Sequence, residues 1–242
     1  MKKILFAALA LLVSTAPIFG QEKNDAFRPK EVWNDTSGEP INAHGGGIMY
    51  HKGTYYWYGE YKVGKTILPS WATWECYRTD VTGVSCYSSK DLLNWKFEGL
   101  ALKAVPDDPN HDLHPSKVCE RPKVIYNKKT KKFVMWIHAE SADYSMAAAG
   151  VAVSDRPEGP FEYIGSFRPN ETMSRDQTLF VDDDGTAYHI HSAEENLTLN
   201  IAELTPDYLD YTGRYIRLAP GGHNEAPTIM KRDGVYWMIT SG

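Results

Sequence analysis

Four polar residues stand at matching places in this sequence, and three of them are acidic. His44, Asp176 and Glu225 each lie nine residues before the glycine of a turn that leads into further apolar and aromatic residues. Glu120 precedes a similar segment whose turn is about two residues longer. Carboxylates that meet from distant segments suit glycoside hydrolysis, because one protonated acid must donate to the leaving oxygen while other groups activate water or tune proton affinities. Glu120, Asp176 and Glu225 are therefore the candidate catalytic residues.

A purely structural interpretation of these acids stays open. They could cap turns, or pair with Arg121 and Arg175, which are adjacent in sequence. The repetition favours chemistry, because a capping acid has no reason to fall at the same place in each repeat. The sequence also holds 7 Trp and 15 Tyr, whose flat apolar faces are surfaces on which sugars can stack.

The repeated unit predicts the elements that position these residues. Each unit has a short apolar run, a turn and a second apolar run, which is typical of a β-hairpin, and residues 83–89 and 150–155 predict a third strand. A strand-rich period of about fifty residues indicates a β-propeller, whose blades surround a central channel. No segment shows a sustained helical period, so we expect an all-β domain. The residues that open the blades should converge at one end of the channel.

Two insertions and the last unit depart from the regular repeat. Residues 62–80 and 104–117 lengthen the first interval, and we expect them to be loops that shape a binding site. The fourth unit stops at Gly242, two strands into its blade. We therefore expect a catalytic propeller in residues 21–242 that is truncated at its C-terminus, because an open ring exposes unpaired strand edges.

The N-terminus and the charge indicate where the protein acts. Residues 1–20 combine two lysines, an apolar run and small residues, which is the pattern of a bacterial export signal, and the run is too short to span a bilayer. A periplasmic or secreted protein is expected. The net charge is −5 without a basic stripe, so neither nucleic acid nor a membrane is an expected partner.

The cysteines and histidines give no metal-binding pattern. Cys76, Cys86 and Cys119 lack ligand spacing, and a disulfide between Cys76 and Cys86 stays as open as three buried thiols. The pair His189 and His191 shares one strand face, and a second pair lies at positions 111 and 114. We predict no metal ligands and no cofactor, and leave a structural calcium ion open.

The blade-opening segments resemble the five-bladed propeller enzymes of glycoside hydrolase family 43. Those enzymes use an Asp base, an Asp that modulates the acid, and a Glu acid, which open blades one, three and four. Residues 176–185 resemble the modulator segment, and residues 224–227 resemble the acid segment. The blade-one Asp is absent, since residues 42–47 read Asn-Ala-His-Gly-Gly-Gly. The resemblance implies a five-bladed propeller, of which this chain covers about three and a half blades.

In lacking the blade-one Asp, the sequence resembles one branch of the family, the exo-β-1,3-galactanases. Residues 42–47, 57–60 and 119–124 resemble motifs of this branch. The resemblance implies a secreted enzyme that cleaves β-1,3-galactan, the backbone of arabinogalactan, in exo fashion with inversion.

The same resemblance implies roles for individual residues. Glu225 would be the proton donor, Asp176 its modulator, acting by like-charge repulsion, and Glu120 a galactan-binding carboxylate. The substitute base would be a Gln in the fifth blade, beyond Gly242, acting as its imidic tautomer. The expected substrate-binding residues are His44, Glu60, Tyr144, Asn196 and Thr240.

Two other functions stay open. A family-43 β-xylosidase or α-L-arabinofuranosidase would keep the same acid and modulator, but it should have the blade-one Asp. A sugar-binding propeller without catalysis fits the missing base. Retention of Asp176 and Glu225 argues against it, because a lectin needs no proton donor.

Overall fold

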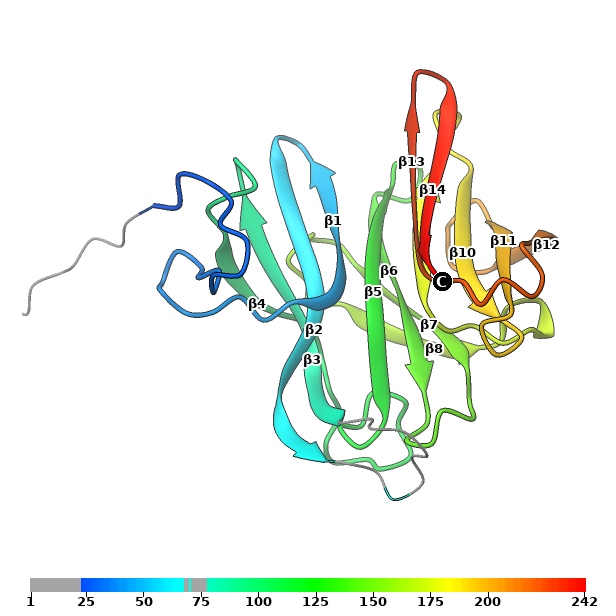
Figure 1. The fold of residues 1–242 in the computed structure, drawn as a ribbon, viewed down its shortest axis with the longest axis horizontal. Helices are drawn as coiled ribbons and strands as arrows, with labels where there is room; N and C mark the ends of the chain where they lie inside the picture. Colours follow the sequence, from blue (N-terminus) through cyan, green and yellow to red (C-terminus); the bar gives the residue numbers. More distant parts are fainter. Residues whose placement is uncertain (1–22, 68–69, 71–77) are drawn as a thin grey trace, which may run out of the picture.

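The computed structural model describes residues 23–67, 70 and 78–242, and it consists almost entirely of β-strands. Three antiparallel sheets of four strands follow one another along the chain, and a two-stranded hairpin comes last. In the described ranges the one helical element is a short 3₁₀ turn, Pro169–Glu171. Figure 1 shows the three sheets side by side, in blue to cyan, green, and yellow to orange, with the hairpin in red. The predicted all-β propeller, with three blades and half of a fourth, is confirmed.

Each blade is a simple meander, in which successive strands pair with their neighbours. Blade one consists of β1 (His44–His51), β2 (Thr54–Ile67), β3 (Arg78–Ser89) and β4 (Lys96–Lys103). Blade two consists of β5 (Val118–Asn127), β6 (Lys132–Glu140), β7 (Ala148–Ser154) and β8 (Glu162–Phe167). Blade three consists of β9 (Gln177–Val181), β10 (Ala187–Ala193), β11 (Thr198–Leu204) and β12 (Tyr211–Leu218). The hairpin of the fourth blade consists of β13 (Glu225–Arg232) and β14 (Val235–Ser241).

Strand β6 shows how neighbouring blades pack. Met135 and Ile137 belong to the apolar cluster shared with blade one, whereas Val134 and Trp136 belong to the cluster shared with blade three. This alternation follows from the two-residue period of a strand, and both faces of β6 are buried. The Trp136 indole also donates to the carbonyl of Tyr208 in blade three, at 2.9 Å. Blade two is therefore packed against a neighbouring blade on both sides.

Apolar side chains at the two ends of the blade series are exposed. Val124, four residues after Glu120, is 7% exposed, whereas Ile48, four residues after His44, is 54% exposed. On the last hairpin, Trp237 and Ile239 are 54% and 60% exposed. The difference arises because blade two has a neighbour on each face, whereas β1 and β14 each have one face without a blade against it among the described residues.

The two insertions differ from each other in the structure. The expectation that residues 62–80 form a loop is wrong for the described part, because β2 continues to Ile67 and pairs with β3 from Arg78 onward. The extended part of β2 contains Val63, Thr66 and Ile67, which are residue types that favour β-strands. Residues 104–117 do form a loop, as predicted, and Asp112 in it accepts hydrogen bonds from Ser166 and Tyr163 of β8. This loop therefore packs on blade two.

Several sequence predictions concern residues that the structure does not describe. The export signal in residues 1–20 and Cys76 lie outside the described residues. Cys86 and Cys119 are buried free thiols. In the described part of the chain, no helix is long and apolar enough to cross a membrane.

Candidate active site

The blade-opening residues are His44, Glu120, Asp176 and Glu225, and three of them, all but Asp176, are presented by a repeated irregularity of the inner strands. The strand register shifts directly after His44, Glu120 and Glu225. The residue that follows each of them has a positive φ: 60° at Gly45, 52° at Arg121 and 46° at Ala226. Such β-bulges bend a strand and redirect its side chains, and they are frequent next to active sites.

Glycine is required at only one of these three bulges. A Cβ atom on Gly46 would lie 1.6 Å from the backbone carbonyl oxygen of Tyr58, which is far too close. Arg121 and Ala226 adopt the left-handed backbone of Gly45 with side chains, at a cost of order 1 kcal/mol each. The bulges are therefore strained features that the surrounding sheet maintains.

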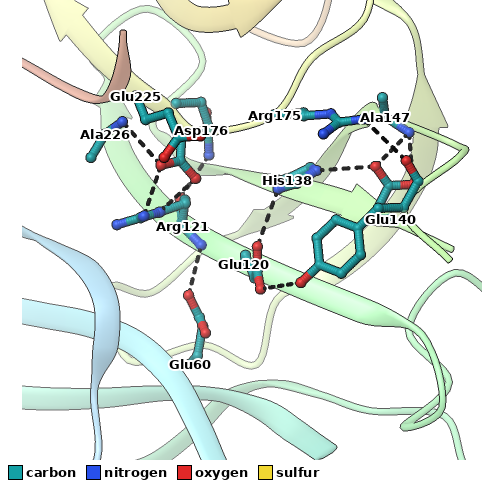
Figure 2. A network of polar contacts seen from close by, with 12 residues as sticks. Glu60, Glu120, Arg121, His138, Glu140, Ala147, Arg175, Asp176, Glu225 and Ala226 are labelled. Atoms are coloured by element: carbon teal, nitrogen blue, oxygen red, sulfur yellow. Dashed lines mark hydrogen bonds and ion pairs between the residues drawn. The ribbon is translucent and has the colours of Figure 1, made fainter. Parts of the chain in front are cut away.

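Asp176 is the centre of the site. Its Oδ1 accepts from Nε of Arg121 at 2.7 Å, and its Oδ2 lies 2.7 Å from the second guanidinium nitrogen. The same Oδ2 accepts from the backbone N–H of Ala226 at 3.0 Å, which connects Asp176 to the strand that begins with Glu225 (Figure 2). Asp176 therefore joins blades two, three and four. The expectation that an acid pairs with Arg121 is met by Asp176. Arg175 instead pairs with Glu195, at 2.6 Å.

Glu120 lies beside Asp176. Polar atoms of Glu120, His138 and Asp176 all lie within 4.8 Å of one another. The Tyr144 hydroxyl donates to Oε1 of Glu120 at 2.9 Å, and Oε2 lies 3.4 Å from Nδ1 of His138. Burial alone would raise the pKa of Glu120, but His138, Tyr144 and the charge of Lys62 lower it to about 2. Glu120 is therefore an ionised acceptor with a side chain that is 22% exposed.

Glu225 is exposed, and a loop of blade three reaches it. The Asn196 amide donates to Oε1 of Glu225 at 2.6 Å. Asn196 ends a run of three consecutive residues with positive φ, beginning at Glu194, between β10 and β11. Thr240, on β14, accepts from the amide of Asn224 at 2.9 Å, directly before Glu225. The structure thus brings the expected contacts Asn196 and Thr240 to the neighbourhood of Glu225.

Blade one contributes His44 and Glu60. The His44 ring is 65% exposed, and its Nδ1 lies 3.1 Å from Oε2 of Glu60. The Glu60 carboxylate is 1% exposed, pairs with Lys62 at 2.8 Å and accepts the backbone N–H of Arg121 at 3.1 Å. Glu60 therefore also supports the Arg121 bulge. The sugar contacts of Glu60 and of the other expected residues stay predictions.

The cluster of Glu120, His138 and Asp176 has the spacing of a metal site, but its two carboxylates already bind protein groups. Arg121 occupies both oxygens of Asp176, and Tyr144 donates to Glu120. Burial would lower the pKa of His138, but the adjacent Glu120 and Glu140 raise it to about 9, which favours a protonated ring that cannot bind a metal. The donor set does not fit a cation well, and the prediction of no metal ligands stays a prediction.

The site lies on the wall of the central channel. A cavity of about 510 Å³ opens between the four inner strands, and Arg121, Gln177 and Ala226 are among its lining residues. Sequence reasoning gave Arg121 as a possible partner of the acids but missed the role of His138. The one signal for His138 was a polar residue inside the apolar run of β6, with Glu140 two positions later on the same face.

Comparison with known proteins now identifies the family. Residues 47–242 match the family model described as glycosyl hydrolases family 43. The chain belongs to glycosyl hydrolase family 43. One similar solved structure is a family-43 β-1,3-galactosidase with galactodeoxynojirimycin, which is 46% identical with a TM-score of 0.80 and shares 88% of this chain and 72% of its own.

Two further family-43 structures are exo-β-1,3-galactanases. The enzyme from Phanerochaete chrysosporium, solved with β-1,3-galactotriose, is 37% identical with a TM-score of 0.77 over 87% of this chain and 46% of its own. The enzyme from Clostridium thermocellum is 42% identical with a TM-score of 0.75 over 88% of this chain and 45% of its own. A curated relative, a β-D-galactofuranosidase of Aspergillus niger, is 23% identical over 203 residues, which are 74% of this chain and 59% of that protein. This chain therefore spans roughly half of these two galactanase structures.

Proposed function

We propose that this family-43 protein is a secreted glycoside hydrolase that cleaves β-1,3-galactan, the backbone of arabinogalactan, in exo fashion with inversion. The observation that carries the proposal is that Glu120 and Asp176, from two different blades, lie within 4.8 Å of each other, while Asp176 binds the backbone directly after Glu225 of a third blade (Figure 2). The β-1,3-galactosidase and exo-β-1,3-galactanase structures described above support this choice of substrate.

Each carboxylate takes a different role in this proposal. Glu225 is exposed and acts as the general acid, protonating the glycosidic oxygen, and Asn196 orients its carboxyl group. Asp176 is the modulator next to the acid, and Arg121 and the Ala226 N–H hold it there by binding both of its oxygens. Glu120, presented with Tyr144, accepts hydrogen bonds from hydroxyl groups of the terminal galactose.

None of these three carboxylates activates the attacking water in this proposal. The blade-one position holds His44 where the other branches of the family are expected to have an Asp. We propose that the fifth-blade Gln implied by the family resemblance acts as its imidic tautomer, and that this tautomer is the base that takes a proton from the attacking water. With that arrangement, attack from the face opposite Glu225 inverts the anomeric carbon.

A substrate panel tests the proposed function. The full-length protein should release galactose from β-1,3-galactan, and proton NMR should show the α-anomer first, because inversion of a β-linkage gives an α-product. A β-1,4-xylan and an α-arabinan serve as matched controls and should release no sugar. Release of xylose or arabinose would favour the xylosidase or arabinofuranosidase alternative. Binding of galactan without any release would favour the sugar-binding propeller.

A further inference from the structure

His138 is a buried histidine with a carboxylate at each ring nitrogen. It lies on β6 and is 2% exposed. Its Nε2 is 3.4 Å from Oε2 of Glu140, and its Nδ1 is 3.4 Å from Oε2 of Glu120 (Figure 2). Glu140 is fully buried, whereas Glu120 is partly exposed in the site. The three side chains therefore form a line that runs from the protein interior to the candidate active site.

The inner end of this line is firmly anchored. Glu140 accepts backbone N–H groups of Ser141 at 2.9 Å, Met146 at 2.6 Å and Ala147 at 2.8 Å. Burial would raise the pKa of Glu140, but the contact with His138 and these backbone donors lower it. The same contacts fix the loop between β6 and β7, which carries Tyr144. Glu140 therefore supports both groups that contact Glu120.

The charges around His138 require a cation at this position. Glu120 faces it from β5, Glu140 from its own strand and Asp176 from the segment before β9, and Arg121 neutralises Asp176. The Tyr144 ring lies 6.3 Å from the His138 ring, and Ala149, its partner on β7, carries no charge. Two buried carboxylates that share one imidazole would repel each other if the ring were neutral.

We propose that His138 is a positioning residue, an imidazolium held by Glu140 that keeps the Glu120 carboxylate ionised and aimed at the substrate. The inference rests on the proposed function, because it takes Glu120 to bind galactan. The contact between Nδ1 and Glu120 is an ion pair rather than an aligned hydrogen bond, so the effect on Glu120 is mainly electrostatic.

This arrangement has a defined pH dependence. The pKa of His138 is raised from 6.5 to about 9, so its stabilising charge is fully present below pH 6.5 and is lost as the pH rises through about 9. The Glu120 carboxylate loses its cation over the same range. The KM of the wild-type protein for β-1,3-galactotriose is therefore expected to rise above about pH 9.

Ring-nitrogen NMR of the wild-type protein tests the charge state without substrate or substitution. At pH 7, His138 should show imidazolium signals, and it should lose its proton near pH 9. His189 and His191 are equally buried without carboxylate partners and should stay neutral, since burial lowers the pKa of both. A neutral His138 ring at pH 7 would overturn the proposal. This readout is independent of galactan cleavage, so absence of galactose release would count against the proposed function alone.

Kinetics of His138→Gln test the positioning role. The amide keeps a polar side chain but no charge, so KM should rise by roughly tenfold to a hundredfold, the size of a charge-assisted contact. The kcat should change much less, because a contact made equally in ground and transition states affects KM. The alkaline rise of KM should disappear. His51→Gln, which removes a ring that packs on Tyr126 and Phe133, is the control and should keep the wild-type KM and its pH dependence. A wild-type KM in His138→Gln, or a retained alkaline rise, would refute the role.

Discussion

Glu225→Gln is expected to lower the kcat for β-1,3-galactotriose by about 10²- to 10⁴-fold while the dissociation constant changes little. The amide has the shape of the carboxyl group, and it can still accept the hydrogen bond from Asn196. It cannot donate a proton to the leaving oxygen. The measurement is galactose release under saturating substrate, combined with calorimetry of β-1,3-galactotriose binding.

The control for this substitution is Glu162→Gln. Glu162 is an exposed glutamate on β8, so its replacement changes the same functional group away from the channel. It should leave both kcat and binding unchanged. If Glu225→Gln retained wild-type turnover, Glu225 would not be the general acid, and the proposed mechanism would fail at its main step.

Asp176→Asn is expected to lower kcat by about 100-fold and to reduce stability by about 1–3 kcal/mol. Both oxygens of Asp176 accept hydrogen bonds, from Arg121 and from the Ala226 N–H. An asparagine has only one acceptor oxygen, so its amide group would face a donor and leave it unpaired. The strand that begins with Glu225 would lose one of its ties to blade three.

Asp155→Asn is the matched control for this second substitution. Asp155 also pairs with a cation, Lys132 at 2.6 Å, but its side chain is 79% exposed. Exposed ion pairs contribute little, so stability should change by less than about 0.5 kcal/mol, with no change in kcat. Thermal melting and initial rates of both variants make the comparison. Equal effects of the two substitutions would mean that the connections of Asp176 have no special importance.

Much of the fold follows from local patterns in the sequence. The hairpin units around the Gly53, Gly185 and Gly234 turns, and the absence of a helical period, predict the blades. The convergence of Glu120 and Asp176 follows from propeller geometry, because both residues open inner strands. The extension of β2 to Ile67 was missed, because a long insertion between strands gives no local signal that separates a loop from a longer ladder.

The interactions within the site could not be predicted, because they depend on register and on bulges. His138 faces Glu120 because the two residues are partners across β5 and β6, and no sequence pattern gives that pairing. Arg121 reaches Asp176 from a left-handed backbone that its residue type does not favour. The contact of Glu60 with the site could not be predicted either, because Glu60 accepts the backbone N–H of Arg121 at the bulge.

The most direct test of the central claim is a crystal structure of Glu225→Gln with β-1,3-galactotriose. We expect the terminal galactose at the channel mouth, with its hydroxyl groups on Glu120 and its glycosidic oxygen within hydrogen-bonding distance of the residue 225 amide. Tyr144 and Asn196 should border the sugar. A trisaccharide that lies elsewhere, for example in the groove between Tyr126 and Asp184, with no contact to Glu120 or residue 225, would contradict the account.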